Sequence, residues 1–484
     1  MTDPAMISAN MTGASTTTLP TSATALVPPD IVPVAAARLA RTLTGSVVAP
    51  DDEEWDAARQ AWNLAIDRQP VLVVFAESAT DVAATIDYAR AEGLNVNPQG
   101  TGHNASVRAD LSGTILLRTD RMCEITVDPS TRTVRAEAGA LWRDVTDALA
   151  PHGLVGLAGS SGDVGVVGYL LGGGYGWLAR RYGLGCSSIT AVDIVTGDGR
   201  FHRVDAEHEP ELSWAVRGGA GNVGVVTAIE FTAFPCAQVY AGALLFPIER
   251  AREVLLAYER WTRDLDESAT TCIRLLRVPP LPDIPEFARG RSFIGIDGAI
   301  DLPADRAEEL LAPLRALGPQ VDMFAPMPAA ALSHIHMDPP QPSPARSDGM
   351  VLADLPPQAI DALLAVAGPG VESPLLAVDL RDLGGAVGRP APGGGAVDHI
   401  PGRFLLFAVG ITPVPEAQAP VMAAVEAVTD ALAPWRFERD YLNFRDTPAA
   451  AARFYDPRTL DRLLTVQREH DPQRVVRPNQ QWVA

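Results

Sequence analysis

The run Pro98-Gln99-Gly100-Thr101-Gly102-His103-Asn104-Ala105-Ser106 constrains this chain more than any other part of its sequence. It follows a short apolar segment that contains Leu94 and Val96. Glycine permits a tight turn and lets backbone N–H groups approach a ligand closely, as in an anion-binding nest. The run therefore predicts a phosphate-binding loop that ends in a histidine.

A second glycine-dense run follows later in the chain, Gly168-Tyr169-Leu170-Leu171-Gly172-Gly173-Gly174-Tyr175-Gly176. A single such run would indicate one close approach of backbone to ligand. Two of them, separated by a mixture of helical and strand patterns, predict loops that wrap one large cofactor.

The hydrophobic pattern between and around these runs predicts an α+β fold. An apolar run at 71–75, a helical pattern that Ser78 or Thr80 can cap and Gly93 ends, and a strand at 94–97 form a β-α-β unit. Hairpins are expected at 124–137 and 190–204, a helix at 141–149, a short helix at 211–217 and a strand at 225–231. Such a mixture is not typical of a simple doubly wound sheet.

The pattern of predicted helices and strands changes near residue 237. Strands are expected at 239–246, 272–278, 375–380 and 404–409, with helices at 250–263 and 417–432. The segment 280–350 carries many prolines and is interpreted as a connection rich in loops. We therefore expect a flexible tail and lead-in at 1–50, a first domain at 51–236, a second domain at 237–437, and a separate segment at 438–484.

Composition excludes several classes of protein. The 484 residues are 47% hydrophobic and carry a net charge of −20, which argues against nucleic acid or an anionic membrane as a partner. The first 30 residues lack the basic and apolar regions of a signal peptide, and no apolar run is long enough to span a membrane. Four scattered cysteines predict reduced thiols in a cytoplasmic protein and no CxxC metal framework: Cys123, Cys186, Cys236 and Cys272.

Three other motifs have ordinary explanations. Gly219-x-Gly221-x-x-Gly224 matches the dinucleotide fingerprint, but a strand follows it where a helix is required. His334-Ile335-His336 could place two metal ligands on one strand, yet its Pro-rich surroundings favour a surface histidine pair, and no metal is expected. Ser160 and Ser161 lie beside a glycine without the G-x-S-x-G elbow of a serine hydrolase.

The order of the motifs is what distinguishes His103 from a structural histidine or a general base. The His103 loop is followed by Ala158-Gly159-Ser160-Ser161, Val164-Gly165-Val166-Val167-Gly168, the second glycine run, Val195–Gly199, Asn222–Thr227 and Tyr441-Leu442-Asn443-Phe444. Through about 68–236 and 440–484 this arrangement resembles the berberine bridge enzyme-like flavoproteins. These belong to the vanillyl-alcohol oxidase (p-cresol methylhydroxylase-type) superfamily of FAD proteins.

The resemblance implies a two-lobed FAD-binding domain that the C-terminal segment 438–484 completes. An inserted substrate domain at 237–437, an antiparallel sheet covered by helices, would lie over the isoalloxazine ring. His103 would be bonded covalently to the 8α-methyl group of FAD, with the backbone of Gln99–Asn104 around the pyrophosphate. Many relatives carry a cysteine as a second tether at the position of Ser161. Serine cannot form that thioether and Cys186 lies too far along the chain, so one covalent link is expected.

The resemblance also assigns roles to other positions. Val164 falls where oxygen access to the flavin is gated, and valine is the residue that favours an oxidase. Three departures from the family pattern are Tyr169 for a common histidine, Phe444 for a tyrosine, and Ala105-Ser106 for a frequent Ser-Tyr. The expected cofactor-binding residues are His103, Gln99, Gly100, Thr101, Gly102, Asn104, Ala105, Gly159, Ser160, Ser161, Val164, Gly168, Gly172, Gly173, Gly174, Tyr175, Gly176, Gly224, Val226, Asn443 and Phe444.

The predicted reaction is hydride transfer from a substrate C–H bond to FAD, followed by reduction of O2 to hydrogen peroxide. Tyr441 and Tyr169 are the expected catalytic residues, as base or orienting groups, and His399 and Tyr175 are weaker candidates. The substrate would be a small alcohol or amine, such as a secondary metabolite. The alternatives are a carbohydrate oxidase and a flavin-binding protein without redox turnover.

Overall fold

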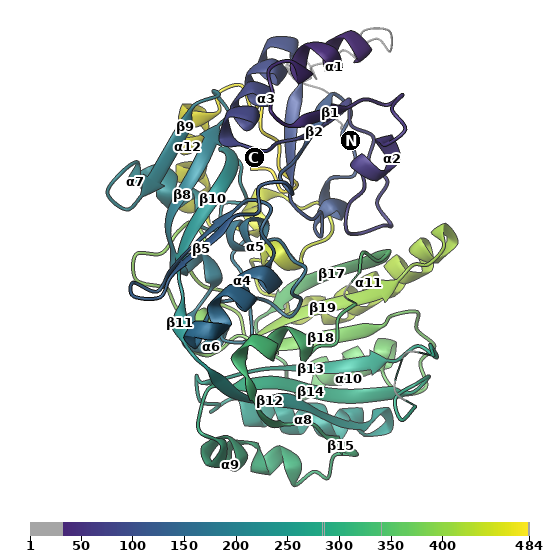
Figure 1. Cartoon of the computed structure of the whole chain (residues 1–484). Helices are drawn as coiled ribbons and strands as arrows, with labels where there is room; N and C mark the ends of the chain where they lie inside the picture. The colour runs from purple at the N-terminus through teal and green to yellow at the C-terminus, as the bar shows by residue number, and fades with distance from the viewer. Residues whose placement is uncertain (1–31, 283, 285, 340, 483–484) are drawn as a thin grey trace, which may run out of the picture.

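Residues 32–282, 284, 286–339 and 341–482 are described by the computed structural model, and they pack around two large hydrophobic cores. The first core gathers residues from 39–233 and 441–482 together with five from 351–405, and the second gathers residues from 240–432. Figure 1 shows the first part above, with the yellow C-terminal segment running through it, and the second part below as a broad sheet. No helix among the described residues has both the length and the apolar character needed to cross a bilayer.

A four-stranded sheet forms the first lobe of the upper part. Strands β2 and β3 both pair in parallel with β4, and β1 pairs antiparallel with β2. The predicted β-α-β unit is confirmed: the Ser78 side chain caps α3 by accepting from the Asp81 N–H, and Gly93 ends it at φ 69°. The elements are α1 (Val32–Ala40), β1 (Ser46–Val48), α2 (Trp55–Ala58), β2 (Leu72–Phe75), α3 (Ala79–Glu92), β3 (Asn95–Gln99) and β4 (Thr114–Arg118).

A five-stranded antiparallel sheet, in the order β5-β6-β10-β8-β9, forms the second lobe. Both predicted hairpins are present, β5 with β6 and β8 with β9. Trp142 and Phe231 fill the core beneath this sheet. The elements are β5 (Ile125–Asp128), β6 (Thr133–Glu137), α4 (Trp142–Leu149), β7 (Leu154–Val155), α5 (Val166–Leu171), α6 (Ala179–Tyr182), β8 (Ile189–Thr196), β9 (Phe201–Asp205), α7 (Pro210–Val216), β10 (Gly224–Thr232) and β11 (Phe234–Pro235).

The lower part is a large antiparallel sheet in the order β15-β12-β14-β13-β18-β19-β17, with β16 paired to β12. Alternate strand residues such as Leu244, Ile273 and Leu380 share a core with helices α8 to α11. The opposite face carries polar residues and faces the upper part. The elements are β12 (Gln238–Pro247), α8 (Ala251–Thr262), β13 (Ala269–Arg277), β14 (Ser292–Ile300), α9 (Ala304–Arg315), β15 (Val321–Asp322), β16 (Ala325–Pro328), β17 (Ala345–Leu352), α10 (Pro357–Ala367), β18 (Ala377–Asp382), β19 (Phe404–Ile411) and α11 (Gln418–Leu432).

The fold class is as predicted, but the interpretation of 280–350 as mainly loop is wrong. This segment contains β14, α9 and most of β17. Pro303 lies at the N-cap of α9, where a missing N–H costs nothing, and Pro313 lies inside the same helix. Strand β14 is buried on both faces, so its sequence shows no alternation of polar and apolar residues.

The two ends of the described chain meet at the first sheet. Residues 1–31 of the expected N-terminal tail lie outside the described residues, and α1 and β1 follow them. After α12 (Pro457–His470), the chain returns to β3, where the Val96 N–H donates to Val475 O at 2.8 Å. The C-terminal segment therefore packs on the lobe that carries the His103 loop.

A buried ion pair joins the upper part to the sheet below. Arg180, on α6, and Arg403 both bind the carboxylate of Asp382 at the end of β18, which is fully buried. The Tyr175 hydroxyl donates to the backbone oxygen of the same aspartate at 3.1 Å. Removing the carboxylate would leave two guanidinium groups without their counter-charge.

We expect Asp382→Asn to lower the free energy of unfolding by about 3–5 kcal/mol, because breaking a buried pair leaves uncompensated charge. The measurement is urea denaturation followed by circular dichroism. The matched control is Asp361→Asn, which breaks the exposed pair with Arg252 and should leave the free energy of unfolding nearly unchanged, because water screens that pair. Equal losses in the two variants would show that the Asp382 pair does not hold the parts together.

Candidate functional site

The two glycine runs lie side by side in the upper part. The His103 loop leaves the end of β3, and the second run includes α5. A Cβ atom built on Gly165, the N-cap of α5, would lie 3.7 Å from the Thr101 side chain, so the His103 loop lies against the start of the helix that leads into the second run.

His103 sits in a preorganised environment. Its ring stacks on Trp62, with centroids 4.2 Å apart and planes inclined by 18°. The Thr101 hydroxyl lies 2.7 Å from Nδ1. Nε2 is buried and faces Oδ1 of Asp163 at 3.7 Å. The imidazole is thus held by the Trp62 ring on its face and by the Thr101 hydroxyl at Nδ1, while Nε2 points toward Asp163.

Three side chains lie around the Asp163 carboxylate, those of Trp62, Ser161 and His103. Trp62 Nε1 donates to Oδ2 at 2.6 Å, and the Ser161 hydroxyl donates to Oδ1 at 2.6 Å. Burial opposes ionisation, but these donors and His103 together lower the pKa of Asp163 to about 2. Asp163 is therefore a carboxylate throughout the neutral range.

The C-terminal segment packs directly on the second glycine run. A Cβ on Gly172 would overlap the Asn443 side-chain amide, and one on Gly173 would lie 2.8 Å from the Tyr441 ring. Gly173 also has φ 122°, where other residues are strained. Asn443 then donates to Tyr169 O at 2.9 Å. Glycine is required at positions 172 and 173 because the C-terminal segment occupies the space that a side chain would fill.

Gly168 differs from those glycines because its Cα faces open space. It is exposed, and nothing lies within 4 Å of a Cβ built on it. His103, Val164 and Tyr169 are partly exposed as well. A glycine-rich backbone with an open position at Gly168, together with a partly exposed histidine, fits a flat, phosphate-bearing cofactor such as FAD.

The other expected cofactor residues fall into three places. Gln99 is buried and donates to Gln60 O at 3.0 Å, and Asn104 donates to Arg445 O at 3.0 Å, so the His103 loop is held from both sides. Ser160 donates to Asp338 at 2.9 Å. The remaining residues line the loops or the adjacent strand β10: Gly100, Gly102, Ala105, Gly159, Gly174, Gly176, Gly224 and Val226.

Of the two expected catalytic tyrosines, Tyr441 is buried and Tyr169 is mostly enclosed by protein. Burial raises the pKa of Tyr169 and of Tyr441 well above the ordinary value, so neither is a phenolate at neutral pH. Tyr169 already donates to Leu157 O at 3.0 Å, and the Tyr441 hydroxyl accepts from Asn443 Nδ2 at 3.3 Å. Both hydroxyls suit an orienting role better than proton abstraction.

An aromatic and cationic wall faces the runs from the sheet below. Phe444 meets Phe407 of β19 edge to face, with centroids 5.1 Å apart. The Arg381 guanidinium of β18 lies 4.8 Å from the centre of the Phe444 ring. The tyrosine absent from position 444 is thus replaced by an apolar ring that stacks with a cation.

Behind this wall lies a buried cluster of five ionisable side chains. His336 reaches Asp297 through Nδ1 at 3.0 Å and Asp379 through Nε2 at 3.1 Å. Arg274 pairs with Asp297 at 2.6 Å, and Arg381 pairs with Asp379 at 3.4 Å. Burial lowers the pKa of His336, but the carboxylates outweigh it and the net shift is upward. The expectation of a surface histidine pair is right for the exposed His334 and wrong for His336, because acidic residues distant in sequence surround it.

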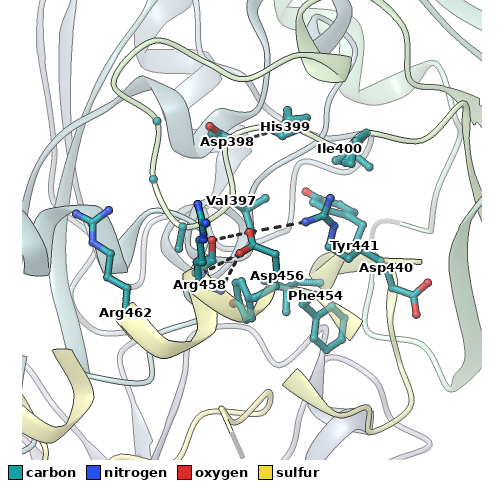
Figure 2. Close-up of a pocket in the computed structure, with 18 of the residues that line it drawn as sticks. Val397, Asp398, His399, Ile400, Asp440, Tyr441, Phe454, Asp456, Arg458 and Arg462 are labelled. Carbon is teal, nitrogen blue, oxygen red and sulfur yellow. Dashed lines mark hydrogen bonds and ion pairs between the residues drawn. The ribbon is translucent and has the colours of Figure 1, made fainter. Parts of the chain in front are cut away.

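A separate cavity of about 440 Å³ lies between the loop 394–401 and α12. Figure 2 shows Tyr441 and the Asp398–His399 pair on its wall, with Asp456 and Arg458 among the other labelled residues. His399 Nδ1 lies 2.5 Å from Asp398. Among the described residues that line this cavity, none belongs to either glycine run, so His399 is not placed with His103.

Comparison with known proteins agrees with this geometry. Residues 70–205 match the family model described as an FAD binding domain. The chain is 30% identical over 236 residues to the FAD-linked oxidoreductase YgaK of Bacillus subtilis (strain 168), covering 48% of this chain and 52% of that protein. It is 30% identical over 291 residues to (R)-6-hydroxynicotine oxidase of Paenarthrobacter nicotinovorans, covering 57% and 59%. The matches thus span a little over half the length of these relatives.

The fold has counterparts among solved structures. Physcomitrella patens BBE-like 1 superposes with a TM-score of 0.81 at 17% identity, covering 94% of this chain and 99% of that one. A variant of berberine bridge enzyme superposes with a TM-score of 0.75 at 17% identity, covering 92% and 98%.

The matched domain is an FAD binding domain, and similar proteins are named FAD-linked oxidoreductases and oxidases. The chain has the fold of the berberine bridge enzyme-like proteins. The predicted resemblance is confirmed at this level, and the matches support FAD as the cofactor.

Sequence reasoning missed several residues of the site. Asp163 stands inside a glycine-rich motif region, and a carboxylate between glycines was the available signal. Trp62, Asp379 and Arg381 carry no motif, because sheet pairing and loop packing bring them into place from distant positions.

We expect Gly168→Ala to weaken FAD binding at least tenfold while leaving the apoprotein as stable or more stable by up to about 1 kcal/mol, since alanine favours the helix. Fluorescence titration with FAD and thermal unfolding of the apoprotein measure the two effects. Gly176→Ala is the contrast, because its Cβ would overlap Ala158 O and should destabilise the apoprotein itself. Unchanged FAD affinity in Gly168→Ala would contradict this location for the cofactor.

Proposed function

We propose that this protein is an FAD-dependent oxidase that removes a hydride from an alcohol or amine carbon of a small organic molecule, such as a secondary metabolite. FAD held by this domain would supply the hydride acceptor and the route for two electrons to O2, which would leave as hydrogen peroxide. The observation that carries the proposal is the match of residues 70–205 to an FAD binding domain, which contains both the His103 loop and the second glycine run. The oxidase among its relatives, (R)-6-hydroxynicotine oxidase, supports it.

Within this proposal His103 is the single covalent anchor of FAD. The His103 side chain is partly exposed, and its ring is fixed by Trp62 and Thr101. Ser161 provides a hydroxyl where a second link would require a thiol, and that hydroxyl is bound to Asp163. Cys186 is buried and its thiol contacts Val397 O, so it does not substitute for the thiol that Ser161 lacks.

The protein's own residues would orient the substrate and exclude water. Tyr441 and Tyr169 are proposed as the residues that fix the second glycine run, and through it the cofactor, by hydrogen bonds and ring packing. Phe407 and Phe444 supply an apolar wall, and Arg381 supplies a fixed positive charge behind it. This wall would desolvate a substrate that lies against the cofactor.

A carbohydrate oxidase is the second candidate. Glucooligosaccharide oxidase of Sarocladium strictum is 29% identical over 192 residues, which cover 39% of this chain and 38% of that protein. A solved structure of glucooligosaccharide oxidase from Acremonium strictum is described with a 6-S-cysteinyl, 8α-N1-histidyl FAD. Ser161 forbids the first of these links here, which favours the smaller substrate.

The proposed partners are a small-molecule substrate and O2. The net charge of −20 disfavours nucleic acid and anionic membranes. All four cysteines are free, and a reducing compartment such as the cytoplasm is proposed for this reason.

We expect wild-type protein precipitated in acid to retain a yellow pellet, and peptide mass analysis to find one flavin on the peptide that contains His103. His103→Ala should give a colourless pellet while still binding FAD without a covalent bond. Ser161→Ala is the control and should keep the covalent flavin. A colourless wild-type pellet, or a flavin on Cys186, would contradict the single histidyl link.

Hydrogen peroxide release separates an oxidase from a flavin-binding protein without turnover. We expect anaerobic bleaching of the flavin absorbance by at least one alcohol or amine in a substrate panel, and stoichiometric peroxide when air is admitted. Oligosaccharides form the second arm of the panel. Bleaching by sugars alone would favour the second candidate, and bleaching by no substrate would favour a protein without turnover.

A further inference from the structure

The side chains around His103 are arranged for more than holding a finished link. Asp163 is one-tenth exposed and faces Nε2, the buried nitrogen of the ring. Trp62 contributes twice, because its ring stacks on the imidazole and its Nε1 donates to Asp163. Ser161 donates to the same carboxylate. Asp163 is thereby held in one orientation beside the ring.

This arrangement selects one tautomer of the imidazole. A carboxylate only accepts hydrogen bonds, so the nitrogen that faces Asp163 is the one that carries the hydrogen. Nδ1 then presents its lone pair, to which the Thr101 hydroxyl can donate at 2.7 Å. A neutral imidazole with a free lone pair on Nδ1 is the nucleophilic form of histidine.

We propose that Asp163 is the positioning residue that activates His103 for its own covalent attachment to FAD, with Nδ1 as the attacking atom. The inference rests on the proposed histidyl link and adds how the protein makes it. Asp163 holds the hydrogen on Nε2 before attack and accepts that proton once Nδ1 has formed its bond.

The attachment is balanced when dioxygen is the oxidant. A bond forms between Nδ1 and the 8α-methyl carbon, while the imidazole N–H bond and one methyl C–H bond break. The two protons and two electrons released convert one O2 to one hydrogen peroxide. The oxidant is therefore the same one that the proposed activity uses.

Asp163 and Trp62 act on the ring from two sides, and the fold explains why both are needed. The 3.7 Å between Nε2 and Oδ1 is too long for a strong hydrogen bond in the apoprotein. Motion of the imidazole parallel to the Trp62 ring would shorten that distance.

The test measures the rate of attachment and not catalytic turnover. Full-length protein is produced under riboflavin limitation, mixed with FAD in air, and sampled into acid, and covalent flavin is read from the absorbance of the pellet. Non-covalent FAD affinity is measured in parallel by fluorescence quenching within the first minute. We expect Asp163→Asn to slow attachment at least tenfold with non-covalent affinity within threefold of wild type.

A matched control and a rescue distinguish positioning from a structural effect. Asp338→Asn removes the carboxylate that binds neighbouring Ser160, and should attach FAD within twofold of the wild-type rate. Asp163→Ala should attach slowly and be accelerated at least threefold by 100 mM formate but not by chloride at equal ionic strength. This rescue also decides the matter if Asp163→Asn does not fold.

Attachment in Asp163→Asn within twofold of wild type, or equal acceleration of Asp163→Ala by formate and chloride, would overturn the role of Asp163 while leaving the histidyl link intact. Wild-type protein that never acquires covalent flavin would overturn the link and this inference with it. The two failures are therefore distinguishable in one series of pellets.

Discussion

The close approach of the C-terminal segment to the second glycine run is the contact on which the rest of the site depends. Asn443 and Tyr441 occupy the positions that Cβ atoms of Gly172 and Gly173 would fill. The same segment carries Phe444 to the sheet below and continues to the Val475–Val96 contact beside the His103 loop. Two adjacent glycines, Gly172 and Gly173, thus leave room for the C-terminal segment to reach both lobes and the sheet, and side chains at these two positions would block that path.

The polar face of the large sheet shows how the fold tolerates charge in its interior. Two arginines, two aspartates and His336 occupy neighbouring strands and one covering loop, and the charges of the arginines and the aspartates cancel. Buried charges are stable only when each has partners. Arg381 belongs to this cluster and also lies against the Phe444 ring. The cluster therefore holds one residue of the aromatic and cationic wall in place.

Much of the fold could be predicted from sequence because its signals are local. Ser78 and Gly93 bound α3 through capping and left-handed geometry, and the hairpins follow from their turn residues. Strand β14 was not predicted because a strand that is buried on both faces shows no alternation of polar and apolar residues. The partners of His336 were not predicted for a different reason. Asp297 and Asp379 become its neighbours only through the pairing of β14 and β18 with β13. The glycine runs predicted a cofactor loop, whereas Trp62 and Asp163 depend on tertiary packing.

Ser161 and Asp163 are best understood together. The Ser161 hydroxyl lies 2.6 Å from the Asp163 carboxylate. A cysteine at 161 would place its thiol beside that negative charge, which would raise the thiol pKa and suppress the thiolate that any cysteinyl link requires. A carboxylate has the opposite effect on an imidazole, since it stabilises the proton on the nitrogen that it faces. If FAD is attached as proposed, Asp163 would therefore favour the link through His103 and disfavour one through position 161, so the serine and the aspartate would act together.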